Sequence, residues 1–215
     1  MRGGRIIKAW FKNKAADRVL APVREAIVEL IENGCGLLDV GCGTGDLLFR
    51  AKDKIRFGLG VDLDPAMIRF AEARKRSSGC DHLEFVHEDI RSYEKLSNHD
   101  IDVASSTLCL HEMREEDAVD TLKLLAALSS KILVADYTKP KLFWSRVFIE
   151  LDEIISGHYG RFRQYRENGY LPYLAGRAGL MVVQAKETPI DGILLWELKG
   201  KGGRGEISPL STENG

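Results

Sequence analysis

Hydrophobic residues first recur at a helical period and then gather in short runs that alternate with helical segments. From Asp17 to Asn33 the apolar positions lie three and four residues apart, which predicts a helix with Asp17 as its N-cap and Gly34 beyond its end. Further along, apolar runs predict strands at 36–41, 57–63, 83–88, 101–106 and 131–137. Helical spacing predicts helices at 46–54, 65–77 and 115–128. Such alternation predicts right-handed crossovers and a mostly parallel sheet.

The last third of the chain departs from this alternation. Two helical stretches, 143–155 and 160–178, precede two strands at 180–188 and 193–200 that a short turn joins into a hairpin. The fold class expected is therefore α/β, a three-layer sandwich around a seven-stranded, mostly parallel sheet with a C-terminal antiparallel hairpin. Helix breaks are expected near Gly169 and Pro172.

Three segments follow from the composition along the chain. We expect a basic N-terminal arm or lid at 1–16, a folded domain at 17–200 and a disordered, glycine-rich polar tail at 201–215. The 215 residues, 44% hydrophobic and 29% charged, suit one globular domain. No apolar run reaches the roughly 20 residues that span a bilayer, and no signal peptide is recognisable, so a cytoplasmic protein is expected.

Charge and cysteine content exclude further classes. The formal net charge of -1 gives no overall field that would attract DNA. The four cysteines form no CxxC pair and lie at no metal-ligand spacing, so we expect reduced thiols and no metal site.

A glycine-rich loop is the strongest chemical signal. Residues 37–45 read Leu-Leu-Asp-Val-Gly-Cys-Gly-Thr-Gly, a strand that runs into three glycines before a helix. Dinucleotide loops have the spacing G-x-G-x-x-G, with the pyrophosphate on the helix N-terminus. Here the spacing is G-x-G-x-G, and Asp46 stands where the third glycine would be, so its carboxylate is expected to repel a pyrophosphate. This disfavours NAD and favours a phosphate-free amino-acid nucleoside.

Two acidic residues follow the next strands. Asp62 ends the second strand roughly 20 residues after the loop, where a carboxylate can accept both hydroxyl hydrogens of a ribose. Asp64 precedes Pro65 and is expected to cap the next helix. Asp89, after the third strand, could accept the exocyclic amine of adenine while Ile90 packs on the ring, although an aspartate after a strand is common.

Together these motifs resemble the class I S-adenosylmethionine-dependent methyltransferases. Residues 37–45 are similar to the family's first motif, residues 60–64 to its acidic second motif and residues 88–90 to its adenine-side motif. The resemblance covers residues 17–200. It implies a Rossmann-like fold in which the last strand is inserted antiparallel.

The resemblance also implies which residues hold the methionine half of the cofactor. The backbone of Gly41, Cys42 and Gly43 would bind the methionine end. Asp39 would support the loop and the amino group, and Ser106 would lie near the methionyl group and the sulfonium.

For the nucleoside half, the resemblance implies four residues. Asp62 would take the ribose hydroxyls, with Leu63 beside the adenine. Asp89 and Ile90 would flank the base.

The implied activity is methyl transfer by in-line displacement, with S-adenosylhomocysteine as the product. Orientation alone can supply about 7–11 kcal/mol of such a reaction's barrier, so the lack of a catalytic triad is no counter-evidence. Residues 105–113, Ser-Ser-Thr-Leu-Cys-Leu-His-Glu-Met, are similar to the segment after the fourth strand in small-molecule methyltransferases of the ubiquinone and menaquinone type. The N/D-P-P-Y motif of amide and base methylation is absent from the sequence. The expected partner is thus a small-molecule acceptor.

Acceptor-side residues are expected above the same strand ends. His111 and Glu112 follow the fourth strand, although Glu112 could equally favour a helix start. His158 and Tyr159 lie in an aromatic, arginine-rich stretch that could bind an anionic or aromatic acceptor, or could be a solvated amphipathic helix. The apolar pairs at 143–144 and 147–148 are expected in the core, with a lid or dimer face as the alternative.

Three other functions compare with methyl transfer as follows. A nicotinamide oxidoreductase is disfavoured by the glycine spacing. A non-catalytic cofactor-binding sensor or partner subunit would keep the same motifs. An RNA or protein methyltransferase has support only from the basic N-terminal arm. A monomer or homodimer, without a transmembrane segment, is expected.

Overall fold

One seven-stranded sheet organises the chain, in the order β3-β2-β1-β4-β5-β7-β6, in a computed structural model that describes residues 3–157 and 159–200. The strands are β1 (Gly36–Val40), β2 (Phe57–Asp62), β3 (Leu83–His87), β4 (Val103–Thr107), β5 (Lys131–Tyr137), β6 (Leu180–Glu187) and β7 (Ile193–Gly200). Neighbours from β3 to β5 pair in parallel, and β7 runs antiparallel to both β5 and β6. The expected Rossmann-like sheet with its C-terminal hairpin is confirmed.

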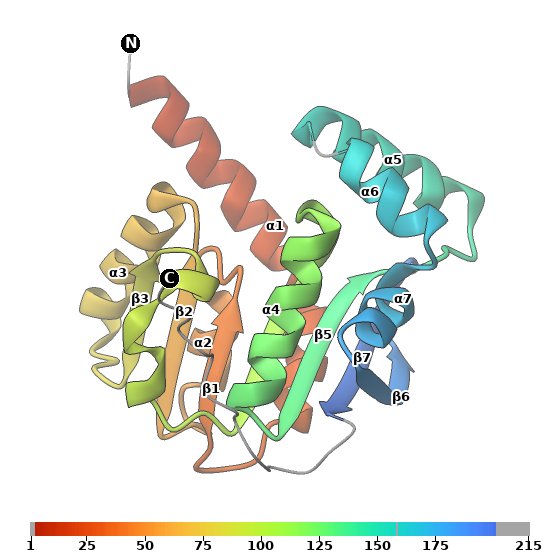
Figure 1. Cartoon of the computed structure of the whole chain (residues 1–215). Helices are drawn as coiled ribbons and strands as arrows, with labels where there is room; N and C mark the ends of the chain where they lie inside the picture. Colours follow the sequence, from red (N-terminus) through yellow and green to blue (C-terminus); the bar gives the residue numbers. More distant parts are fainter. Residues whose placement is uncertain (1–2, 158, 201–215) are drawn as a thin grey trace, which may run out of the picture.

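Helices cover both faces of this sheet and its carboxyl edge. They are α1 (Gly3–Leu30), α2 (Asp46–Ala51), α3 (Pro65–Ser78), α4 (Glu115–Leu128), α5 (Phe143–Ser156), α6 (Tyr159–Glu167) and α7 (Tyr170–Arg177), with the short 3-10 turns η1 (Ile90–Ser92), η2 (Glu94–Asn98) and η3 (Leu110–Glu112). In Figure 1, α4 and α7 lie in front of the sheet, while α5 and α6 lie above its upper edge. On the other face α1 contacts α2.

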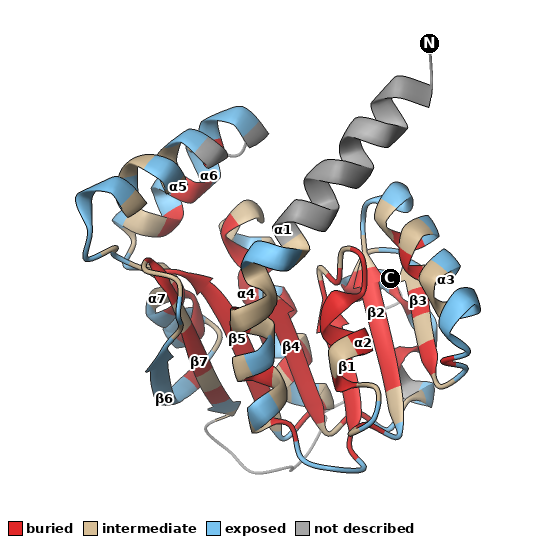
Figure 2. Ribbon diagram, turned by 180° about the vertical axis from the view of Figure 1, so that it is seen from behind, coloured by how far each residue is buried: buried red, intermediate tan, exposed pale blue. Residues whose placement is uncertain are grey.

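The core follows the strands that are covered on both faces. Every residue of β1 is buried, as are six of the seven residues of β5, and Figure 2 shows these central strands as largely buried. A strand buried on both faces needs a continuous apolar run rather than alternation, which is what these segments have. Burial here therefore fixes the strand ends from which the site is built.

A single buried carboxylate joins the helices of one layer. Asp46, the first residue of α2, accepts from Arg24 of α1 at 3.2 Å, Arg50 of α2 at 2.6 Å and Arg74 of α3 at 3.0 Å. Burial would raise the pKa of Asp46, but the hydrogen bonds and charges of these arginines outweigh it and lower the pKa. Three guanidinium groups thus offset the charge of Asp46, and its repulsion of a pyrophosphate stays a prediction.

The first helix starts earlier than the sequence predicts. It begins at Gly3, so Asp17 lies inside it and is not an N-cap. Asp17 instead accepts from Arg24 at 2.7 Å and from the Thr44 hydroxyl at 2.8 Å, which ties α1 to the glycine loop. The side chains of residues 3–16 and the expected tail at 201–215 lie outside the described residues, so the division into arm, domain and tail stays a prediction.

For the region after β5, the structure confirms one expectation and contradicts two. The predicted break between α6 and α7 is confirmed at Gly169, whose φ is +103°. Pro172 causes no break, because it sits in the first turn of α7, where no intrahelical N–H bond is lost. The prediction that Phe143, Trp144 and Phe148 belong to the core is wrong, since all three are exposed on α5.

Among the described residues, none of the helices is long and apolar enough to cross a bilayer.

The entry to β1 offers a test of the sheet's central register. A Cβ at Gly36 would lie 2.1 Å from the backbone oxygen of Asp100, and Gly36 and Asp102 exchange hydrogen bonds across this approach. We expect Gly36→Ala to lower the free energy of unfolding by about 1–3 kcal/mol in chemical denaturation. The control is Gly176→Ala in α7, which meets open space and should raise stability by up to about 1 kcal/mol. Equal effects of the two substitutions would contradict this packing.

Candidate functional site

A cavity of about 380 Å³ opens at the carboxyl edge of the sheet. Its walls come from the residues that follow β1, β2, β3 and β4, from the start of α4, and from α6. The lining residues are Val40, Gly41, Val61, Asp62, Leu63, Glu88, Asp89, Ile90, Arg91, Leu108, Cys109, Glu112, Met113, Arg114, Asp117, Thr121 and Arg161. Ligands of open α/β sheets bind at this edge, so the cavity is the candidate site.

The turn after β1 requires glycine. Gly41 has a φ of +72°, and a Cβ there would lie 2.4 Å from the Cys109 sulfur. The N–H groups of Gly41 and Cys42 both donate to the Val61 oxygen, at 2.9 and 3.2 Å. The turn is therefore held against β2, with its first glycine facing the cavity.

Asp62 supports this turn from the end of β2. Its Oδ2 accepts from the Gly43 N–H at 2.7 Å, and its Oδ1 accepts from the Asp64 N–H at 2.8 Å. A carboxylate offers about four acceptor positions, so roughly two remain toward the cavity. That is the number a ribose diol requires. Asp64 caps α3 as expected, accepting from the Ala66 N–H at 2.7 Å.

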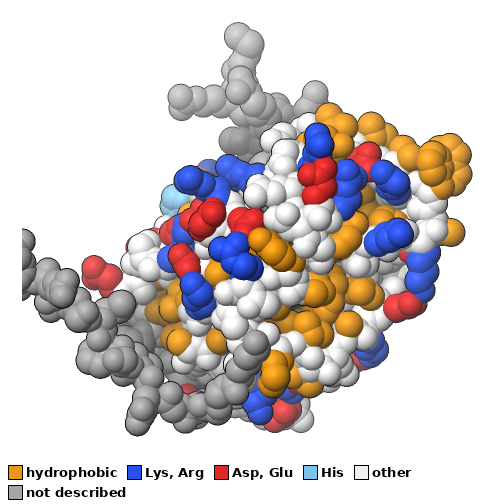
Figure 3. All heavy atoms as spheres, turned by 45° about the vertical axis from the view of Figure 1, so that its right-hand side comes forward, with side chains coloured by type: hydrophobic (Ala, Val, Ile, Leu, Met, Phe, Trp, Pro, Cys, Tyr) orange, Lys and Arg blue, Asp and Glu red, His pale blue; other side chains and the backbone are white. Residues whose placement is uncertain are grey.

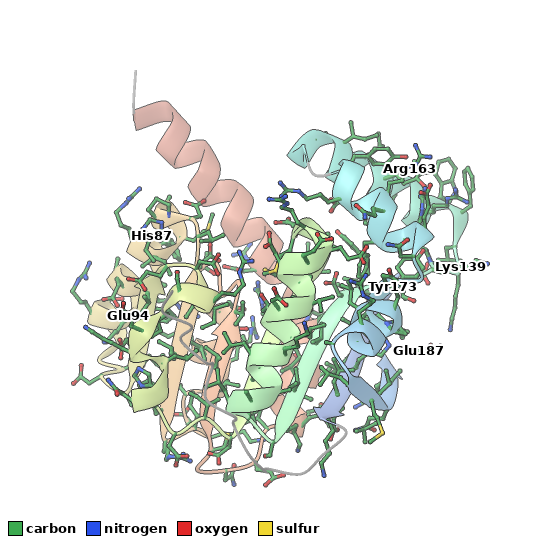
Figure 4. All side chains as sticks on the ribbon, viewed as in Figure 1. His87, Glu94, Lys139, Arg163, Tyr173 and Glu187 are labelled. Atoms are coloured by element: carbon green, nitrogen blue, oxygen red, sulfur yellow. The ribbon has the colours of Figure 1, made fainter. Side chains whose placement is uncertain are left out.

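The apolar wall beside Asp62 is held in place by a histidine. Leu63 is 66% exposed and lines the cavity. The His87 ring lies at the end of β3 (Figure 4), and its Nε2 is 3.0 Å from the Leu63 oxygen, so this nitrogen donates. An exposed leucine fixed in this way presents an apolar surface suited to a flat ring.

Asp89 and Ile90 form the next wall of the cavity, but most acceptor positions of Asp89 are already used by Arg91. Asp89 caps η1 and accepts from the Arg91 N–H and Nε, both at 3.0 Å, and from Nη2 at 2.6 Å. These hydrogen bonds from Arg91 lower the pKa of Asp89, and they leave about one acceptor position free. Ile90 is buried and reaches the cavity. Arg91 also binds Asp117 of α4, so η1 and α4 are joined at this wall.

Four predicted residues, two in the strands behind the turn and two in the turn itself, do not line the cavity. Asp39 is buried in β1 and accepts from the Ser105 hydroxyl at 2.9 Å; burial raises its pKa to about 7 despite that hydrogen bond. Ser106 in β4 is buried, and its hydroxyl has no partner within the described part of the chain. Cys42 is buried too, and burial raises the pKa of its thiol, which suits a small packing residue and not a nucleophile. Gly43 contributes the N–H that binds Asp62.

A second polar cluster lies sealed beneath α5 and α6. His111 donates from Nδ1 to Asp136 Oδ1 at 2.5 Å, and its Nε2 is 3.3 Å from Glu153 Oε1. All three side chains are buried, and His111 does not line the cavity. Asp136 also accepts from the backbone N–H groups of His111 and Tyr137, at 3.3 and 2.7 Å. The cluster thus joins the loop after β4 to the end of β5 and to α5.

The histidine in this cluster is held in its charged form. Burial alone would lower the pKa of His111, but the charge and hydrogen bond of Asp136, together with Glu153, raise it to about 10. The rings of Tyr137, Phe162 and Tyr165 surround the imidazole. Sequence reasoning missed Glu153, because nothing in its local sequence distinguishes it from the other acids of an amphipathic helix.

Of the other residues predicted on the acceptor side, the structure places only one at the cavity among those that it describes. Glu112 lines the cavity, and its backbone oxygen accepts from Arg161 of α6 at 2.8 Å. Tyr159 is half-buried against the core and does not line the cavity. His158 lies outside the described residues.

Three apolar residues that were not predicted individually as site residues also line the cavity. Leu108, Cys109 and Met113 line it, and Leu108 has a φ of +50°, uncommon for a leucine. Such strain is often found where a fold shapes a binding site. The signals in the sequence were their position directly after β4 and their place in the 105–113 segment that resembles small-molecule methyltransferases.

Comparison with known proteins adds a family match. A family model described as a methyltransferase domain matches residues 37–130, the segment from β1 to the end of α4. Uncharacterized methyltransferases of Mycobacterium tuberculosis and Mycobacterium bovis are each 30% identical over 107 residues. The match covers 49% of this chain and 52% of each relative, so the chain spans about half the length of the relatives that it matches.

Solved structures support the fold. An S-adenosylmethionine-dependent methyltransferase from Clostridium acetobutylicum is similar with a TM-score of 0.64 and 14% identity, covering 91% of this chain and 100% of that one. One from Aquifex aeolicus has a TM-score of 0.58 and 14% identity, covering 85% and 92%. An O-methyltransferase from neocarzinostatin biosynthesis, solved with S-adenosylmethionine and a hydroxylated naphthoic acid, has a TM-score of 0.66 and 19% identity, covering 92% and 59%.

Because the pKa of His111 is raised, the free energy of unfolding should fall as the pH rises through the alkaline range. Because the folded-state pKa is about 10 against a usual 6.5, the stabilisation is complete below about pH 6.5 and is lost as the pH rises toward 10. We expect His111→Gln to cost about 3–5 kcal/mol at neutral pH and to remove this part of the slope. Chemical denaturation at a series of pH values measures both.

His82→Gln is the matched control for this series. The His82 ring is part-buried and bonds the neutral backbone oxygen of Lys52 at 3.0 Å, so this variant should keep the wild-type slope. A His111→Gln slope parallel to that of the wild type would contradict a charged imidazole.

Proposed function

We propose that the chain is a class I S-adenosylmethionine-dependent methyltransferase and that it transfers a methyl group to a small-molecule acceptor in the 380 Å³ cavity. The observation that carries this proposal is the meeting of Gly41, Asp62 and Ile90, from three different strand ends, at one cavity. S-adenosylmethionine would supply a methyl group already activated on a sulfonium.

The residues present suit the nucleoside half of this cofactor. Asp62 keeps two acceptor positions for the ribose hydroxyls, because its other two hold the backbone of Gly43 and Asp64. Leu63 and Ile90 offer apolar surfaces for the base, and Asp89 retains about one position for an amine. None of these contacts calls for a phosphate.

The methionine half would lie against the glycine turn. Gly41 allows the main chain to be approached closely, and the buried Asp39 behind it is the nearest acid on β1 to this turn. A carboxyl group with a pKa near 7 becomes ionised when a cation comes close. Asp39 would therefore attract the amino group, and the unpartnered Ser106 hydroxyl is a second candidate contact.

The acceptor would occupy the end formed by the residues after β4. Leu108, Cys109 and Met113 give it apolar walls, while Glu112 and Arg161 are the polar groups. In this proposal Glu112 contacts the acceptor, and His111 is a positioning residue that fixes the Glu112 loop through Asp136. The cavity has the size of small-molecule sites, which commonly measure about 300–1,000 Å³.

The charge of the lining favours a small molecule over RNA. Five acids, Asp62, Glu88, Asp89, Glu112 and Asp117, line the cavity against three arginines, Arg91, Arg114 and Arg161. An excess of acids repels the phosphates of RNA. The basic N-terminal segment would favour a nucleic acid, but its side chains lie outside the described residues.

Cofactor binding tests the proposal directly. We expect S-adenosylmethionine and S-adenosylhomocysteine to bind in isothermal calorimetry and to raise the melting temperature, and NAD to do neither. Asp62→Ala should weaken binding of both by at least about tenfold, since it removes two hydrogen bonds to a charged acceptor.

Asp64→Ala controls for damage to the same segment. It removes the cap of α3 and should cost about 1 kcal/mol of stability, while cofactor affinity stays within about twofold. Unchanged affinity in Asp62→Ala, or binding of NAD in place of the sulfonium compound, would refute the assignment.

Proton release tests the role of Asp39. Below about pH 7 the free protein holds this carboxyl protonated, and a bound ammonium group would favour its ionised form. Binding of S-adenosylmethionine at pH 6 should therefore release protons, and affinity should rise with pH up to about 7. Calorimetry in buffers of different ionisation enthalpy measures the release, and Asp39→Asn should abolish it. Equal release in Asp39→Asn would assign the proton to another group.

A further inference from the structure

The outer face of α5 carries an apolar surface that nothing in the described chain covers. It consists of large side chains that are all exposed, Leu142, Phe143, Trp144, Phe148, Leu151, Ile154 and Ile155. Trp144, Phe148, Leu151 and Ile155 are spaced four, three and four residues apart, so they form one stripe along the helix, and the other members flank it. Single exposed apolar residues are ordinary, but a contiguous stripe of this kind marks an interaction surface.

The inner face of the same helix is fully engaged. Ile149 packs against the core, and Glu153 is buried beside His111. The helix is therefore anchored by its inner face, and the exposure of the outer face does not come from a loosely placed helix.

Cations outnumber acids beside this apolar stripe, although several of them are paired. Residues 139–167 contain six Lys and Arg against four Asp and Glu, while the whole chain has a net charge of -1. Lys141 binds Glu187, and Arg163 binds Glu167 at 2.7 Å. One of those acids, Glu153, already faces His111, and Glu150 is shared by Arg146 at 3.1 Å and Arg166 at 2.6 Å. Lys139 and Arg163 both lie on this side of the molecule (Figure 4).

The two properties coincide on the surface. Figure 3 shows hydrophobic side chains gathered at the upper right of the molecule, with Lys and Arg side chains beside them. At the start of α5 the sequence reads Lys139-Pro-Lys-Leu-Phe-Trp144, two cations followed directly by two exposed aromatic rings. Aromatic rings next to cations are typical of segments that lie in the headgroup region of a bilayer.

This charge distribution distinguishes a lipid surface from a second copy of the chain. A symmetric contact through α5 would bring the same cationic segment of both copies together, and like charges in one interface repel. An anionic lipid surface complements the cations and accepts the apolar stripe at the same time.

We propose that the outer face of α5 docks onto the surface of a bilayer containing anionic lipids. The helix would lie in the interface plane, with Phe143, Trp144 and Phe148 among the acyl chains. Because α5 packs on α6, which supplies Arg161 to the cavity, docking would place the acceptor end of the site beside the membrane. The docking itself does not rest on the proposed methyl transfer.

Trp144 is a reporter built into this surface. The chain has three tryptophans, of which Trp144 is 67% exposed and Trp196 is 3% exposed. In a full-length Trp10→Phe background, Trp144 is therefore the tryptophan whose fluorescence a membrane contact would change. Vesicles of phosphatidylcholine mixed with phosphatidylglycerol should shift its emission to the blue, vesicles of phosphatidylcholine alone should do so less, and high salt should weaken the effect.

Vesicle sedimentation with surface variants gives the second measurement. Phe148→Gln combined with Ile155→Gln should reduce binding to the mixed vesicles at least tenfold. The matched control is Val183→Thr, which removes apolar surface that is also exposed but lies on the edge strand β6, and it should leave binding unchanged. Sedimentation alone does not locate the contact, because the five basic residues at 2–14 could bind anionic lipid by themselves.

Two outcomes would overturn the proposal. One is a Trp144 emission that the mixed vesicles leave unchanged. The other is a wild-type dimer, seen by analytical ultracentrifugation, that the α5 double variant converts to a monomer without any loss of vesicle binding; the face would then join two copies. Calorimetric binding of S-adenosylmethionine should be the same in the double variant and the wild type, so failure of docking and failure of the proposed function are separate results.

Discussion

The buried Asp46 carboxylate is the contact on which the placement of the site depends. It stands directly after the glycine turn and holds one guanidinium from each of α1, α2 and α3. Removing one partner of a buried charge set leaves the others uncompensated, so these helices cannot shift independently of the turn. The turn is fixed to β2 as well, through Val61 and Asp62. These contacts hold the backbone of the turn against the cavity.

The parts of this arrangement that the sequence predicts are those set by local pattern. The glycine turn at 41–45 and the acid at Asp62 could be assigned because positive-φ glycines and strand-end carboxylates have few other uses in such an order. The strands were predictable because β1 and β5 are covered on both faces and need continuous apolar runs. Helices α4 and α5 were found from the same periodic signal that fixes their length.

The parts that escaped prediction depend on contacts between distant segments. Asp17 resembles a helix cap in its own segment, but its partners are Arg24 and a threonine of the glycine loop. The pairing of His111 with Glu153 is decided by how α5 crosses the loop after β4, which no spacing reveals. For α5 itself, periodicity identifies an apolar face but does not say whether that face meets the core or the solvent.

The two polar clusters near the cavity differ in how completely their bonding is satisfied. Asp62 uses about half of its hydrogen-bond acceptor positions to bind the backbone of the turn and of Asp64, and about half remain for a ligand. The His111 cluster is buried and joins one imidazolium to two carboxylates, and Glu153 Oε2 has no hydrogen-bond partner among the described residues. The ion pair with His111 and the packing of Ile149 still anchor α5 by its inner face, so the helix does not need its outer apolar face for its own position. The outer apolar face of α5 is therefore available for the proposed contact with a bilayer surface.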